Sequence, residues 1–87
     1  MAYRIEVRPS ALRELKSLPK DDRERIDDCI RALATDPRPH GVETLSGPDR
    51  LLRVRVGVYR IIYQVHDNVL LVVIVRVRHR KDVYRRL

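Results

Sequence analysis

Residues 51–65 constrain the fold more than any other stretch, because apolar and basic residues alternate there on either side of one glycine. Such alternation is typical of a β-strand with one buried face, since successive side chains of a strand point to opposite sides. Gly57 interrupts the pattern and predicts the turn between two strands. The stretch therefore predicts a hairpin that buries its apolar side and carries guanidinium groups on the other: Arg53, Arg55 and Arg60.

The N-terminal residues predict a strand followed by a helix. Residues 2–8 alternate between apolar and charged side chains and are followed by a proline, which indicates a first strand. Ser10 is placed to cap a short helix that extends through residue 18. The apolar residues of that helix recur at helical spacing and predict its buried stripe: Leu12, Leu15 and Leu18.

A second helix and a long loop follow. Asp21, with Glu24 three residues later, resembles a capping box and predicts a helix that ends near Thr35. Its apolar stripe consists of four residues: Ile26, Cys29, Ile30 and Leu33. Residues 36–49 contain three prolines and two glycines, so they predict a surface loop.

The C-terminal part predicts a third strand beside the hairpin. Asp67 and Asn68 indicate a turn, and most of Val69–Val77 is apolar on both faces. We expect this strand to lie centrally in the sheet, to have cover on each side, and to pair with the first strand. The basic residues after it predict a short C-terminal helix. Together the elements predict one α+β domain over residues 1–87, of order β-α-α-β-β-β, with two helices on one face of an antiparallel sheet.

The charge is divided unevenly along the chain. Residues 50–87 hold ten basic and two acidic residues, whereas residues 1–49 hold nine basic and ten acidic ones, so the excess of +7 lies entirely in the second part. This asymmetry indicates a polyanionic partner, or an acidic protein that covers the same face. A basic face that only keeps the domain soluble is the alternative.

The remaining residue classes predict a cytoplasmic protein without a cofactor. The only cysteine, Cys29, cannot form an internal disulfide, and the first residues contain no apolar signal sequence. The longest apolar run, Val69–Val75, is too short to cross a bilayer. The three histidines, at positions 40, 66 and 79, lack the spacing of a zinc site, so we expect no metal.

The basic residues of the hairpin and of the third strand suit phosphate chemistry. Guanidinium groups bind phosphate in a bidentate manner, and fixed cations stabilise the charge of a phosphoryl transition state. A tyrosine can stack on a base. The candidate site residues are Arg53, Arg55, Arg60, Arg78 and Tyr84. Arginine stays protonated near neutral pH and is a poor general base, whereas His79 has an ordinary pKa of about 6.5.

At these residues the sequence resembles the RelE/ParE superfamily of toxins from bacterial toxin–antitoxin systems. The resemblance covers nearly the whole chain and is closest in two stretches: Leu52–Tyr63 and Val77–Tyr84. It implies the α+β fold of that superfamily. It also implies a cognate antitoxin that covers the basic face.

Members of the RelE branch cut messenger RNA in the ribosomal A site, by metal-free attack of the RNA's own 2′-hydroxyl on the adjacent phosphate. The resemblance implies that Arg60 stabilises the transition state and that Arg78 serves the leaving oxygen. It matches the remaining branch residues to Arg53, Arg55 and Tyr84. Further basic residues are expected in the RNA-binding surface: Arg76, Arg80 and Lys81.

Two questions stay open at this level. RelE carries lysines where this chain has Arg53 and Arg55, so either His79 accepts the proton or charge stabilisation alone activates the hydroxyl. The ParE branch shares the fold but inhibits DNA gyrase by binding, without nuclease activity. Arg78 together with Tyr84 favours the ribonuclease over the gyrase inhibitor, and a non-catalytic nucleic-acid binder is a third possibility.

Overall fold

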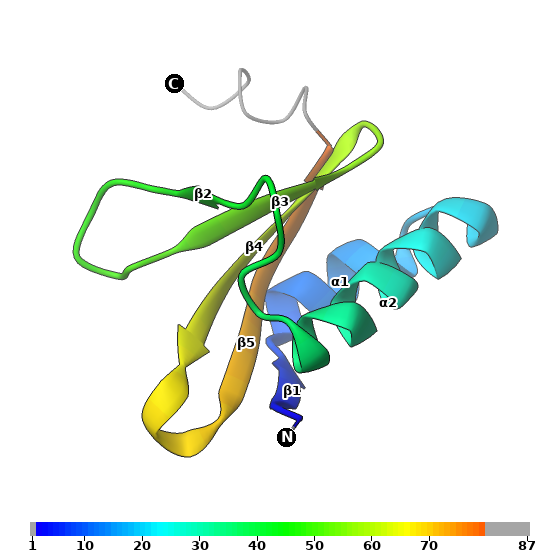
Figure 1. Cartoon of the computed structure of the whole chain (residues 1–87). Coiled ribbons are helices and arrows are strands. Elements are labelled where there is room, and N and C mark those ends of the chain that lie inside the picture. The colour runs from blue at the N-terminus through cyan, green and yellow to red at the C-terminus, as the bar shows by residue number, and fades with distance from the viewer. Residues whose placement is uncertain (1, 80–87) are drawn as a thin grey trace.

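The structure is a computed structural model, and it describes residues 2–79 of the chain (Figure 1). The predicted order of strands and helices is confirmed, with one short strand added inside the predicted loop. The predicted C-terminal helix lies outside the described residues. The elements are β1 (Arg4–Val7), α1 (Pro9–Lys16), α2 (Lys20–Thr35), β2 (Glu43–Thr44), β3 (Leu52–Val56), β4 (Tyr59–His66), a 3-10 turn (Asp67–Val69) and β5 (Leu71–His79).

The five strands form one sheet in the order β1-β5-β4-β3-β2. The expected pairing of the first strand with the strand that follows the hairpin is confirmed by the pair β1 and β5. However, β1 runs parallel to β5, while the other pairs of strands are antiparallel. The prediction of a wholly antiparallel sheet is therefore wrong for this pair. The alternation of side chains shows which face a residue takes, and it carries no information on the direction of the neighbouring strand.

Both helices lie on the same face of the sheet, where α1 packs against β5 and α2 packs against β1, β3 and β5 (Figure 1). The core between the layers is built from aliphatic side chains and one tyrosine, and Ile61 and Tyr63 of β4 are fully buried there. The Tyr63 hydroxyl is not left unpaired, because it donates a hydrogen bond of 2.7 Å to the Pro37 carbonyl oxygen. The predicted inward face of the second hairpin strand is confirmed at these two residues.

The start of each helix differs from the prediction. The first helix begins at Pro9, and Ser10 does not cap it, because the Ser10 hydroxyl donates to the Val75 carbonyl oxygen of β5 instead. The second helix begins at Lys20 after Pro19 and shows no side-chain cap, so the capping box is wrong. Pro9 is the first residue of α1, and Pro19 immediately precedes α2. The fixed φ of proline suits the start of a helix.

Two predictions of burial also need correction. Leu12 of α1 is 43 % exposed, and Ala11 is buried in its place, because the helix is rotated relative to the predicted stripe. The strand β5 has helices on one face only within the described part of the chain, not on both. Val73 on the other face is nevertheless 4 % exposed, between its register partners Glu6 and Gln64.

Neither helix in residues 2–79 is long and apolar enough to traverse a bilayer.

Candidate functional site

A β-bulge in β5 decides which way its arginines point. Ile74 and Val77 are both buried in the core, although they are three residues apart. In a regular strand, two residues that are three positions apart point to opposite faces, so both can be buried on one face only if an extra residue lies between them. That residue is Val75, where the register between β4 and β5 shifts. The shift moves Arg76 and Arg78 to the face away from the helices. Without it, both side chains would point into the core.

The register then aligns the arginines of three strands on this open face. Residues directly opposite in adjacent strands have Cβ atoms only about 4.5 to 5.5 Å apart, so their side chains are neighbours. The open-face residues form two cross-strand rows: Arg55, Arg60 and Arg78 in the first, and Arg53, Ile62 and Arg76 in the second. We call these five arginines the arginine face. Like charges directly opposite one another repel and destabilise a sheet. An anion bound between them would reduce this repulsion.

Two carboxylates contact the arginine face from outside the three strands. Glu43 of β2 accepts a hydrogen bond from Arg53 Nε at 2.9 Å, and its Oε1 lies 3.7 Å from Arg55 Nε. Glu14 of α1 accepts from Arg76 Nη2 at 2.8 Å. Among residues 2–79, five guanidinium groups thus meet two carboxylates, which leaves three positive charges in excess within that part of the chain.

These contacts shift the pKa of two of the residues involved, Glu43 and Arg76. The hydrogen bond from Arg53 lowers the pKa of Glu43, and the charges of Arg55 and Arg60 lower it further. The hydrogen bond to Glu14 raises the pKa of Arg76. The first shift favours the charged form of Glu43, and the second favours the charged form of Arg76.

Arg60 stands at the centre of the first row, between Arg55 and Arg78. Within residues 2–79 its guanidinium group forms no hydrogen bond and no ion pair. It is half-buried, and its strand partners on both sides are also arginines. Its position is therefore the place on this face where an incoming anion meets the fewest competing carboxylates.

His79 does not join the arginines. It is next to Arg78 in β5, so its ring takes the opposite, helix-facing side of the sheet, where it meets Tyr59 edge-on with a centroid distance of 5.4 Å. The prediction that placed His79 near the cluster as a base is therefore wrong in position. The remaining predicted residues, Arg80, Lys81 and Tyr84, lie outside the described residues.

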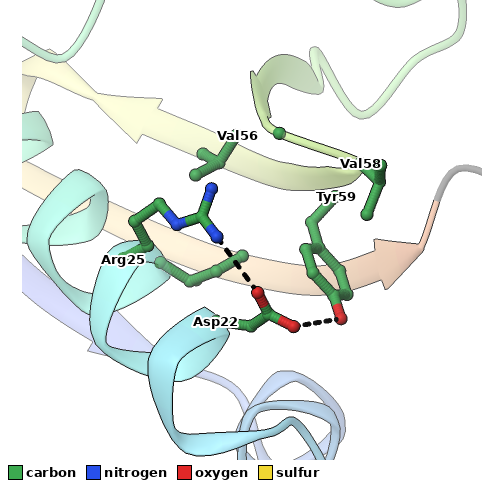
Figure 2. Close-up of a pocket in the computed structure, with 7 residues that line it drawn as sticks. Asp22, Arg25, Val56, Val58 and Tyr59 are labelled. Atoms are coloured by element: carbon green, nitrogen blue, oxygen red, sulfur yellow. Dashed lines mark hydrogen bonds and ion pairs between the residues drawn. The ribbon is translucent and has the colours of Figure 1, made fainter.

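Figure 2 shows how the same end of the hairpin is anchored to α2. The Tyr59 hydroxyl donates to Asp22 Oδ2 at 3.0 Å, and Asp22 also pairs with Arg25 at 3.2 Å. Burial, and then the hydrogen bond to Asp22, raise the pKa of Tyr59. A pocket of about 150 Å³ lies between this network and Gly57. The anchor holds β4 in place immediately before Arg60, on the side of the sheet that faces away from the arginines.

Glu14 and Glu43 are site residues that the sequence did not reveal. Glu14 is 62 residues from Arg76 and Glu43 is 10 residues from Arg53, and nothing in the immediate neighbours of either distinguishes it from a solvated carboxylate. Ser10 and Glu14 are four residues apart on α1 and both contact β5, but that helical spacing is too common to be a signal.

A sequence model of the family described as the ParE toxin of type II toxin–antitoxin systems, parDE, matches residues 5–84. The toxin RelG of Mycobacterium tuberculosis is 31 % identical over 87 residues, which are 99 % of this chain and 100 % of RelG. A chain of the archaeal RelE–RelB complex from Pyrococcus horikoshii has a TM-score of 0.81 at 30 % identity, over 92 % of this chain and 97 % of that chain.

The isolated RelE toxin of E. coli has a TM-score of 0.78 over 99 % of this chain and 100 % of its own, and at 24 % identity this is a likeness of fold. The match to the family model covers all the described strands and helices except the first residue of β1. The chain therefore belongs to the ParE toxin family of type II toxin–antitoxin systems, within the RelE/ParE superfamily, and it is similar to the toxins named RelE and RelG.

Proposed function

We propose that this toxin is an endoribonuclease that cleaves messenger RNA in the ribosomal A site without a metal ion. The observation that carries the proposal is the row Arg55, Arg60 and Arg78 on one open face of the sheet. A phosphodiester that is attacked by a 2′-hydroxyl gathers negative charge on its oxygens, and preorganised cations stabilise that charge. A row of guanidinium groups with an excess of positive charge supports this chemistry.

The roles follow from position in the row. Arg60, at its centre, stabilises the charge on the attacked phosphate, and Arg78 stabilises or protonates the leaving oxygen. Arg53 and Arg55 hold the neighbouring phosphates, with Arg76, Arg80 and Lys81 extending the binding surface. Tyr84 stacks on a base. These roles rest on the resemblance to RelE together with the alignment of the five arginines of the arginine face.

The attacking hydroxyl is activated without a histidine in this proposal. Because His79 takes the helix-facing side of the sheet, it is separated from the arginine row by the backbone of β5. Arginine keeps its proton at neutral pH. Stabilisation of the charged transition state by Arg60 and its neighbours then provides the main acceleration, while the proton leaves to solvent or to the RNA itself.

An antitoxin protein is the proposed partner. The related Pyrococcus horikoshii chain was solved as a complex of RelE with RelB. We propose that a cognate antitoxin neutralises this toxin by covering the arginine face with an acidic or amphipathic segment. Action on ribosomes implies that the toxin works in the cytoplasm.

The test is to express the toxin in cells and to map RNA 5′ ends with and without translation. Arg60→Ala and Arg78→Ala should each lower the cleavage rate by about 100- to 1,000-fold, the usual effect of losing one preorganised donor to a transition state. Arg31→Ala, on the exposed side of α2, is the matched control and should cleave like wild type. Full cleavage by the Arg60→Ala, Arg78→Ala double variant would refute the proposal.

Inhibition of DNA gyrase by binding is the second candidate, because the matching family model is that of ParE toxins. It predicts supercoiling defects and a DNA-damage response while messages remain intact. The same expression experiment distinguishes the two functions, since only the ribonuclease generates new 5′ ends that require translation.

A further inference from the structure

Glu14 of α1 lies where the edge of β5 loses its strand partner. β1 pairs with β5 only as far as Ile74, and the chain then turns into α1. Beyond that point, α1 supplies the missing hydrogen bonds with two side chains one helical turn apart. The Ser10 hydroxyl donates to the Val75 carbonyl oxygen at 3.1 Å, and Glu14 Oε1 accepts from the Val77 N–H at 2.8 Å.

The second oxygen of the same carboxylate holds the arginines on either side of Val77. Oε2 accepts from Arg76 Nε at 3.1 Å and from Arg76 Nη2 at 2.8 Å, and it lies 3.8 Å from Arg78 Nε. The Glu14 and Arg78 side chains are only 23 % and 26 % exposed. One carboxylate thus fixes a backbone N–H of β5 and, through its other oxygen, the two guanidinium groups that the bulge has turned to the open face.

We propose that Glu14 is a positioning residue for RNA cleavage, which holds Arg78, with Arg76 beside it, in the orientation that the leaving oxygen needs. This inference rests on the proposed ribonuclease function. A long arginine side chain has many rotamers in water, and a carboxylate that selects one before RNA binds removes that ordering step from the reaction. Glu14 itself touches neither the RNA nor the reacting atoms.

A rival role for the same contact predicts the opposite sign. If Glu14 competed with the RNA phosphate for Arg78, removal of its charge would speed cleavage. If Glu14 positions Arg78, removal of its charge slows cleavage while RNA binding stays equal or becomes tighter, because the face gains one net positive charge. A fall in kcat without a rise in KM is therefore the signature of positioning.

The experiment compares Glu14→Gln with Glu24→Gln in single-message cleavage on purified ribosomes. Both variants remove one carboxylate charge, and Glu24 lies exposed on α2, where its carboxylate forms no hydrogen bond or ion pair with any of residues 2–79. Glu14→Gln keeps an oxygen that can accept from the Val77 N–H, and circular dichroism checks that the fold is retained. We expect its kcat to fall by up to about 100-fold, as for a misplaced catalytic group, and Glu24→Gln to match wild type.

A double-mutant cycle with Arg78→Ala identifies the residue through which Glu14 acts. In the Arg78→Ala background, Glu14→Gln should have no further effect on kcat, whereas a merely structural role would lower kcat by the same factor in both backgrounds. Glu14→Asp, which keeps the charge but shortens the side chain, should also slow cleavage and so separates position from charge.

The outcomes that overturn the inference are distinct from those that overturn the proposed function. Wild-type protein that leaves the message intact refutes the ribonuclease and this inference with it. Wild-type cleavage together with an unchanged or raised kcat for Glu14→Gln, or with equal losses in both Arg78 backgrounds, refutes the positioning role alone. Loss of the Arg76 Nε–H signal in nitrogen-15 NMR spectra of Glu14→Gln supports the role independently of activity.

Discussion

The salt dependence of RNA binding measures how many charges of the arginine face are available to phosphate. Within the part of the chain that the structure describes, five guanidinium groups meet two carboxylates there, so three positive charges are in excess. Each neutralised phosphate of a single strand contributes about −0.7 to the slope of log affinity against log salt, so this face contributes about −2. Glu43→Gln removes the carboxylate that pairs with Arg53 and Arg55, and should steepen the slope by about 0.7.

The assay is fluorescence anisotropy of a labelled RNA oligonucleotide that carries 2′-O-methyl groups, which block cleavage, over a series of KCl concentrations. The comparison of slopes is independent of basic residues elsewhere in the chain, because these contribute equally to both proteins. Glu24→Gln on α2 makes the same chemical change away from the arginine face and should leave the slope unaltered. An identical slope for wild type and Glu43→Gln would show that Glu43 does not neutralise the face, and a flat salt response would show that the face does not bind phosphate.

Two further predictions concern stability. Ile61→Ala should lower the free energy of unfolding in urea by about 2 to 5 kcal/mol, because Ile61 is fully buried. The control, Val58→Ala at a 42 % exposed site, should change that free energy by less than about 0.5 kcal/mol. A near-zero change for Ile61→Ala would mean that the hairpin faces are assigned backwards. The hydrogen bond from Arg38, and then that from Tyr3, lower the pKa of Asp67 to about 2. The ionised Asp67 therefore stabilises the folded state fully above the ordinary aspartate pKa of about 3.9, and this contribution is lost as the pH falls towards 2. The urea concentration at the midpoint of unfolding should drop for wild type between these two pH values, and it should drop less for Asp67→Asn.

Local patterns in the sequence were sufficient for most of the fold. The alternation around Gly57 predicted the hairpin, and Gly57 has a φ of 60°, which suits the first central position of a tight hairpin turn. Helical spacing predicted Ile26, Ile30 and Leu33 as the buried side of α2. These features depend on residues within a few positions of one another, so a single sequence contains them.

Helix starts were predicted less well, because a side chain at the start of a helix can form its hydrogen bond with a different strand or helix. Ser10 has the character of a cap, but in the folded chain its hydroxyl serves the carbonyl of Val75, which the bulge leaves without a register partner. The sequence shows which residues can donate a hydrogen bond. It does not show which acceptor the folded chain will bring within reach.

The amino-acid sequence by itself determined that arginines would line the outer side of a hairpin, because alternation with apolar residues leaves them no other side. Only the tertiary structure decided that Arg76 and Arg78 join them while His79 does not. That outcome depends on one extra residue, Val75, which enters β5 when its register is matched to β4. Only the folded chain, too, brings Glu14 and Glu43 to those arginines, because the contacts between them follow from how α1 and β2 meet the sheet edges and not from any local pattern.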